Sequence, residues 1–283
     1  MATVTFLGNA DLVSNAATVL EISASGAVAN FEVANVQHPH LGKPLRNTVI
    51  ASIGVRINVS AITPHTVDAI YVMGSNLSTS GKIYLYAHAS DLGVNRAGGG
   101  TPWTGATYAP GEITKLPASY STAYPNHAYY YPASTQNFNW WALFFEDSSN
   151  PDGYIQVGRI LLGLKTQMSA TVGSFSRRIL DASQSGNVKK RTIGGQRVGT
   201  RKYKLRRFAM DFEMLIPAQM ALLQSVWDSH EDQDAFVCHW QTDNIPNDLG
   251  YYMFDQDGFE PIYDPNEEGH DLPDVHVEVE EQK

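Results

Sequence analysis

The sequence predicts a mainly β protein, with a β-sandwich or jelly roll over residues 1–165 and a second β-rich domain with one helix after it. Three observations predict this fold class. Short runs of β-branched and aromatic residues recur along the first part, each bounded by Gly, Pro, Asn or Ser. No helical pattern separates these runs, which is typical of sandwiches and jelly rolls. The chain has 283 residues, which is long enough for two hydrophobic cores.

The early strands of the first domain are predicted at residues 49–59, 69–73 and 82–88. Within residues 53–59, Ile and Val occupy every second position, so their side chains share one face of a strand. Gly54, Arg56 and Asn58 occupy the other face. This alternation predicts a half-buried strand, with one face in the core.

Residues 97–131 contain many Gly, Pro, Ser and Thr residues, which predict a long loop region instead of one regular element. Aromatic residues are spread through this region, and aromatic faces stack on sugar rings. Three of them are candidate glycan contacts: Trp103, Tyr108 and Tyr124. The alternative is that the rings pack over the edge of the sandwich.

Residues 140–145 and 154–162 are rich in β-forming side chains, and the segment between them contains the turn-forming sequence DSSNPDG. We therefore expect the two runs to pair as a β-hairpin. This hairpin would bring the first domain to its end near residue 165.

The second domain is predicted over residues 166–254, with strand-like runs at 203–215, 235–240 and 251–254. Its one helix is predicted at residues 217–230. Pro217 suits the first helical position, and Met220, Leu223 and Trp227 recur at helical spacing and form one apolar face.

The last predicted segment, residues 255–283, is strongly acidic. Its composition predicts a solvated tail or a tail that a partner orders. Three valines alternate with other residues near its end, at positions 275, 277 and 279, and they leave an edge strand open as an alternative.

The charges of the chain are distributed unevenly. The formal net charge is −9, yet residues 177–207 hold eleven Lys or Arg and one acid, whereas residues 255–283 hold eleven acids and one Lys. Oppositely charged segments can pair within a subunit, pair between subunits or serve separate partners. The candidate assembly residues in the basic segment are Arg197, Arg201, Lys202, Lys204 and Arg206. Few aromatic residues accompany them, so the sequence predicts no nucleic-acid binding.

Motifs of catalysis are missing from the sequence. It has no nucleophile elbow, phosphate loop or zinc-protease helix. Cys238 is the only cysteine, and we expect its small side chain to be buried. Its neighbour His239 would face the other side of a strand.

The pair His38 and His40 has no nearby carboxylate or cysteine, which favours an ordinary loop over a metal site. Spacing alone leaves a glycosidase carboxylate pair open, although most acids lie in the C-terminal segment. We expect no enzyme activity, no catalytic residue, no cofactor and no metal.

The apolar runs are short. The longest is far below the roughly 20 residues that cross a bilayer, so no membrane insertion is predicted. The first residues lack the pattern of a signal peptide, and we expect the chain to fold in a cytoplasm.

Two sets of short motifs carry a resemblance to a known family. The first set comprises residues 68–70 before GSNLS, and NPDGYI before GRI and LG at residues 158–163. This part resembles the galactose-binding-like, discoidin-type β-sandwich of structural proteins of tailed bacteriophages. The second set, GGQR at residues 194–197, the basic strand at 203–208 and the helix with Leu222, Leu223 and Trp227, is similar to phage tail-tip and distal-tail components.

The resemblance implies a structural virion protein at the tail tip or distal tail of a long-tailed phage, assembled in the host cytoplasm. The implied partners are other copies of the chain in a ring and neighbouring tail proteins such as the tail tube, hub and adhesin. The alternative function is a carbohydrate-binding module that recognises a host-surface glycan through the aromatic loop.

Overall fold

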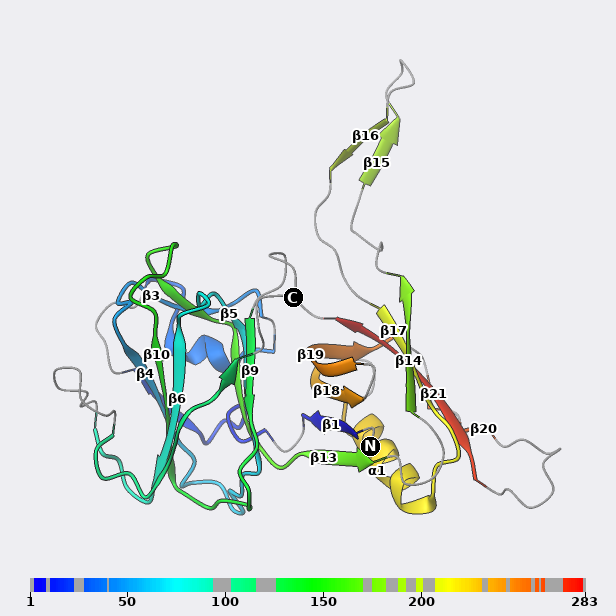
Figure 1. Ribbon diagram of the computed structural model, residues 1–283, viewed down its shortest axis with the longest axis horizontal. Coiled ribbons are helices and arrows are strands. Elements are labelled where there is room, and N and C mark those ends of the chain that lie inside the picture. Colours follow the sequence, from blue (N-terminus) through cyan, green and yellow to red (C-terminus); the bar gives the residue numbers. More distant parts are fainter. Residues whose placement is uncertain are drawn as a thin grey trace. The chain divides into compact units, whose positions relative to one another are not determined.

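The computed structural model describes residues 3–8, 11–22, 28–39, 41–93, 103–115, 126–169, 175–181, 188–191, 197–200, 207–230, 234–242, 245–255, 258–259, 261–262 and 272–281. The chain forms two compact units (Figure 1). Residues 10–165 form the first, here called the sandwich unit. Residues 1–9 and 166–283 form the second, here called the sheet unit.

In the sequence, the sandwich unit is inserted between two paired strands of the sheet unit. Strand β1 (Thr3–Leu7) pairs antiparallel with β13 (Thr166–Ser169), and Phe6 lies opposite Thr166 (Figure 1). The predicted boundary at residue 1 therefore differs from the observed one, because β1 belongs to the sheet unit. A five-residue alternating strand does not indicate which distant strand it will pair with.

The sandwich unit has two main sheets among its described residues. One has the order β2-β4-β10-β6-β7, the other has the order β12-β5-β9-β8, and β3 and β11 form a separate pair. The bounds are β2 Val19–Ile22, β3 Leu45–Asn47, β4 Ile53–Asn58, β5 Ala69–Ser75, β6 Lys82–His88, β7 Tyr108–Glu112, β8 Thr114–Lys115, β9 Asn126–Tyr130, β10 Trp140–Glu146, β11 Ile155–Val157 and β12 Arg159–Gly163. A short 3-10 helix, η1 (Val33–Gln37), precedes β3.

The core of this unit lies between its two main sheets. Alternate residues of β4, β6 and β10, such as Val55, Leu85 and Leu143, meet Val72 and Ile160 of the other sheet in one buried cluster. The structure confirms a mainly β protein with an N-terminal β-sandwich and a second β-rich unit, with one α-helix among the described residues.

The predicted hairpin at residues 140–162 is wrong. Strand β10 pairs with β4 and β6, whereas β11 pairs with β3 and β12 pairs with β5. The DSSNPDG segment thus connects two different sheets. Turn-forming residues reverse the chain locally, but they do not determine whether the next strand returns to the same sheet.

The sheet unit contains a larger sheet of the order β13-β1-β18-β19-β21-β17-β14 within the described residues, with β20 also paired to β21. The remaining bounds are β14 Phe175–Asp181, β15 Val188–Arg191, β16 Arg197–Thr200, β17 Arg207–Phe212, α1 Pro217–His230, β18 Phe236–Thr242, β19 Ile245–Phe254, β20 Pro261–Ile262 and β21 Asp274–Glu281. Leu223 and Val226 of α1 pack into one core with residues of this sheet, and Cys238 lies in the same core as predicted.

The acidic segment 255–283 contributes an interior strand, which corrects the prediction of a tail or an edge strand. Strand β21 lies between β19 and β17, and Val275, Val277 and Val279 are buried in the core. Its other face carries acids, of which Glu278 forms an ion pair with Arg207. Basic and acidic segments therefore pair within one subunit at this place, because strand pairing sets β17 and β21 in register.

Candidate functional site

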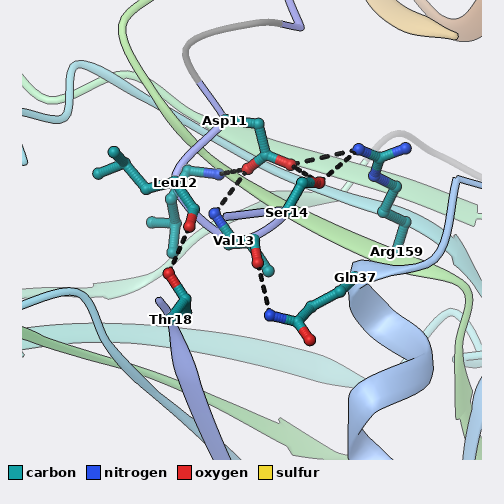
Figure 2. Close-up of polar contacts among 8 residues, drawn as sticks. Asp11, Leu12, Val13, Ser14, Thr18, Gln37 and Arg159 are labelled. Atoms are coloured by element: carbon teal, nitrogen blue, oxygen red, sulfur yellow. Dashed lines mark hydrogen bonds and ion pairs between the residues drawn. The ribbon is translucent and has the colours of Figure 1, made fainter. Parts of the chain in front are cut away.

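A buried ion pair joins the start and the end of the sandwich unit (Figure 2). Asp11 Oδ2 lies 3.3 Å from Arg159 Nη2, and both side chains are almost fully buried. Asp11 Oδ1 accepts hydrogen bonds from the backbone N–H groups of Val13 and Leu162, each at 3.0 Å. The hydroxyl of Ser14 donates to Asp11 Oδ2 at 2.6 Å.

This arrangement holds the first loop of the unit against its last strand. The backbone N–H of Leu12 donates to the carbonyl of Leu162 at 2.7 Å, and Asp11 forms a β-bridge with Gly163. Gln37 donates to the carbonyl of Val13 at 2.7 Å (Figure 2). Because each oxygen of the Asp11 carboxylate accepts two hydrogen bonds, we assign it a structural role.

The outward face of the five-stranded sheet carries a second apolar layer. Tyr86, Phe144 and Trp103 form a buried cluster there, and Tyr84 packs against it. The Trp103 indole N–H donates to the carbonyl of Gly93 at 2.9 Å. Strand β4, predicted to be half-buried, is buried on both faces, and Arg56 on its outward face pairs with Glu21 and Asp91.

Beyond this layer, Asp147 anchors the loop that precedes β6. The residue is 3% exposed. Asp147 Oδ2 accepts a hydrogen bond from the backbone N–H of Ser78 at 2.6 Å, and Oδ1 accepts one from the Ser78 hydroxyl at 2.7 Å. A Cβ atom at Gly81 would lie only 3.0 Å from Asp147 Oδ2, so glycine permits this close approach.

A polar hollow of about 270 Å³ lies at this end of the sheet. Lys82 of β6 and Glu146 of β10 are register partners, and both line the hollow together with Tyr84. The residues that line it are Ala51, Ser80, Lys82, Tyr84, Glu146, Asp147, Ser148 and Ser149. Lys82 also lies 3.7 Å from Glu112, in a pair whose side chains are about half exposed. The hollow thus combines one ammonium group, carboxylates, several hydroxyls and one aromatic ring.

The predicted glycan contacts lie elsewhere. Trp103 is 2% exposed and packs in the apolar layer, so its ring presents no face to a sugar in solution. Tyr108 stacks on Phe138 with a centroid distance of 6.0 Å, and its hydroxyl donates to the Tyr130 hydroxyl at 3.2 Å. Burial and this hydrogen bond raise the pKa of Tyr108. Tyr124 lies outside the described residues. Trp103 and Tyr108 therefore pack against the sandwich, which is the alternative to glycan contact given by the sequence.

The predicted assembly residues belong to the sheet unit. Arg197 begins β16, which pairs with β15. Arg201, Lys202, Lys204 and Arg206 lie outside the described residues. Strands β15 and β16 form a two-stranded sheet of their own among the strands that the structure describes.

Sequence reasoning did not find the residues of the hollow. Its serines occur in two turn-forming segments, SNLSTSG and DSSNPDG, and their composition indicated turns and nothing more. One feature of the sequence could have indicated the hollow. Each of the two Ser-rich turns adjoins a strand end that carries a charged residue, Lys82 in one case and Glu146 in the other. Only strand pairing shows that β6 and β10 are neighbours.

Two features are absent from the described residues: a metal-binding cluster and a membrane-spanning helix. No group of three or more His, Cys, Asp or Glu side chains that could hold a metal ion occurs in the described ranges. In the same part of the chain, no helix has both the length and the apolar composition that crossing a membrane requires.

Comparison of the chain with protein-family models and with curated proteins gives no match. Among solved structures, it is similar to "CpGH89CBM32-6 produced by Clostridium perfringens", at 12% sequence identity and a TM-score of 0.36, over 54% of this chain and 97% of that one. It is also similar to an f-lectin (fucolectin) from the serum of Morone saxatilis (striped bass), at 8% identity and a TM-score of 0.35, over 71% of this chain and 68% of that one. The protein class follows from the chain's own sheets: a β-sandwich inserted into a second β-rich unit.

Proposed function

We propose that the sandwich unit binds a saccharide in the polar hollow. The observation that carries this proposal is the lining of the hollow, which sets Lys82, Glu146 and the serines beside the ring of Tyr84. Sugar hydroxyls both donate and accept hydrogen bonds, so a saccharide can use the ammonium group, the carboxylate and the serine hydroxyls together. An aromatic ring supplies the apolar contact that a sugar ring requires.

The size of the hollow suits a small ligand. Its volume of about 270 Å³ lies just below the range of about 300–1,000 Å³ that is typical of small-molecule pockets. A single sugar unit, at a chain end or on a branch, fits this volume better than a long segment of polysaccharide does. The unit would act by binding, without chemical change of the sugar.

A glycan array followed by calorimetry tests this proposal. Lys82→Ala should weaken binding at least tenfold, because a hydrogen bond from a charged group contributes about 1.5–3 kcal/mol. Ser148→Tyr should abolish binding, because the new ring would fill the hollow while the exposed position tolerates the change. Ser60→Ala, at the other end of β4, is the matched control and should bind normally. Binding that survives both Lys82→Ala and Ser148→Tyr but is lost in Tyr124→Ala would contradict the hollow and place the site in the aromatic loop.

A second proposed function concerns the sheet unit: assembly as a structural virion protein of a long-tailed phage, at the tail tip or distal tail. The observation that favours an assembly role is the separate β15–β16 hairpin, in which three of the four residues of β15 are basic. A two-stranded hairpin is marginally stable alone in water, and a partner surface would stabilise it. The proposed partners are other copies in a ring and neighbouring tail proteins, and the sandwich unit would then offer its hollow to a host-surface glycan.

Charge reversal tests this second proposal. In this proposal, the basic segment meets an acidic surface on a partner. Changing Arg201, Lys202 and Lys204 to Glu should then prevent higher-order assembly, because like charges would repel, and leave both units folded. The measurement is the mass of the assembled species in solution, with circular dichroism as the folding check. Reversal of Lys43, Lys82 and Lys115 in the sandwich unit gives the same change in net charge and is the control. Assembly at the wild-type level by the triple variant would remove the charge-pairing model.

A further inference from the structure

A chain of hydroxyl groups in the wall of the hollow ends on the Asp147 carboxylate. The Ser78 hydroxyl donates to Asp147 Oδ1 at 2.7 Å. The Ser78 and Ser80 hydroxyl oxygens lie 3.0 Å apart, and the Ser80 and Ser149 hydroxyl oxygens lie 2.9 Å apart. The chain therefore runs from Ser149 at the hollow, through Ser80 and Ser78, to the buried acid.

The carboxylate determines the direction of every hydrogen bond in this chain. Each serine hydroxyl has a single hydrogen to donate, and an ionised carboxylate only accepts. Ser78 uses its hydrogen on Asp147, so Ser80 must donate to Ser78. Ser80 has then used its hydrogen, so Ser149 must donate to Ser80. The Ser149 oxygen is left with lone pairs for any further contact.

The buried end of the chain is held firmly. Asp147 is 3% exposed, and its backbone N–H donates to the carbonyl of Ile50 at 3.0 Å. The backbone N–H of Ser78 donates to Asp147 Oδ2, which fixes the side-chain orientation of the acid. Hydrogen bonds in a chain also polarise one another, so each bond is stronger when all of them point in the same direction.

We propose that Ser149 is a specificity-determining residue of the hollow, acting as a hydrogen-bond acceptor for a ligand hydroxyl. This inference rests on the proposed saccharide binding. It adds that Ser149 accepts a hydrogen bond from the ligand and does not donate one. Lys82 only donates, whereas Ser149 and Glu146 accept. The hollow then selects a sugar with a free hydroxyl at the position that meets Ser149, and it discriminates against an analogue whose group at that position cannot donate.

The direction of the chain is measured without any ligand. A neutron structure of the full chain should show the Ser149 deuterium pointing to Ser80 and the Ser80 deuterium pointing to Ser78. A Ser80 deuterium that points to Ser149 would overturn the inference, whatever the protein binds.

The selectivity is measured with methyl β-galactoside, methyl β-glucoside and methyl β-mannoside and their monodeoxyfluoro analogues, in which fluorine replaces a hydroxyl of similar size and cannot donate. For a hexoside that binds, one fluoro analogue should bind at least tenfold more weakly to the wild type. In Ser80→Ala the loss should shrink to about threefold or less, because Ser149 can turn its hydrogen toward the fluorine. The control Ser60→Ala should keep the wild-type ratio.

Two outcomes separate this inference from the proposed function. Equal binding of the parent hexoside and all its fluoro analogues would overturn the role of Ser149 while leaving saccharide binding in place. Absence of binding by all three hexosides and by the glycan array would overturn both the saccharide function and the selectivity, although the neutron structure would still give the direction of the hydroxyl chain.

Discussion

Arg159→Ala should lower the free energy of unfolding of the sandwich unit by about 3–5 kcal/mol, the cost of leaving one charge of a buried pair without its partner. The Asp11 and Arg159 side chains are 1% and 7% exposed, so water does not replace the lost contact. The carboxylate also holds the N–H groups of Val13 and Leu162, and the loop that begins the unit depends on it. Hydrogen exchange of the β5 and β12 amides reports this unit separately from the rest of the chain.

Two variants complete this experiment. Lys82→Ala removes an ion pair whose side chains are 49% and 48% exposed, and it should change the free energy of unfolding by no more than about 1 kcal/mol. The double variant Asp11→Leu with Arg159→Met replaces the pair by apolar groups and should be more stable than Arg159→Ala. A loss below about 1 kcal/mol in Arg159→Ala would show that the ion pair does not hold the unit closed.

Removal of residues 272–283 should unfold the sheet unit and leave the sandwich unit folded. Strand β21 lies inside the sheet, between β19 and β17, so its loss leaves two unpaired strand edges. It also removes Val275, Val277 and Val279 from the core, and each fully buried valine contributes about 1.5–3 kcal/mol. This sum is comparable with the whole stability of a typical domain, about 5–15 kcal/mol.

Differential scanning calorimetry measures this effect. The full chain should show a transition for each unit, and the truncated chain should retain one. A chain that lacks only residues 282–283 is the matched control and should retain both. Val277→Asp should resemble the truncation, because it places a charge without a partner in the core. Two unchanged transitions in the truncated chain would mean that β21 is dispensable, as expected for a solvated tail.

The outward face of β21 explains why an acidic segment can form an interior strand. Arg207 of β17 pairs with Glu278 and with Asp255, so part of the negative charge is neutralised across the sheet. Burial raises the pKa of Glu280, the nearby Asp255 carboxylate raises it further, and Arg207 opposes the rise. Composition indicated a tail, but the alternating valines decided where the segment lies.

The candidate site shows the same limit of composition. Trp103 was a candidate glycan contact because aromatic rings stack on sugars, yet its ring is buried beside Phe144. Apart from Ala51, the residues of the hollow come from two turns and two strands that are about 65 residues apart in the sequence. No local pattern joins Ser80 to Ser149, whereas the pairing of β6 with β10 brings them to 2.9 Å.

The sequence by itself determined the strand character of β4, β5, β6 and β10, the helix, and the side chains that these elements bury. It predicted a loop region where β7, β8 and β9 lie. Alternation in β4 and β6 and the helical spacing of Leu223 and Trp227 depend only on near neighbours, and the helix at Pro217–His230 has the predicted bounds. Only the tertiary structure decided that β1 joins the sheet unit, that β10 and β12 belong to different sheets, and that β21 is an interior strand. Strand partners are selected by the apolar surface that distant segments bury together, and the alternation of a single strand is compatible with many partners.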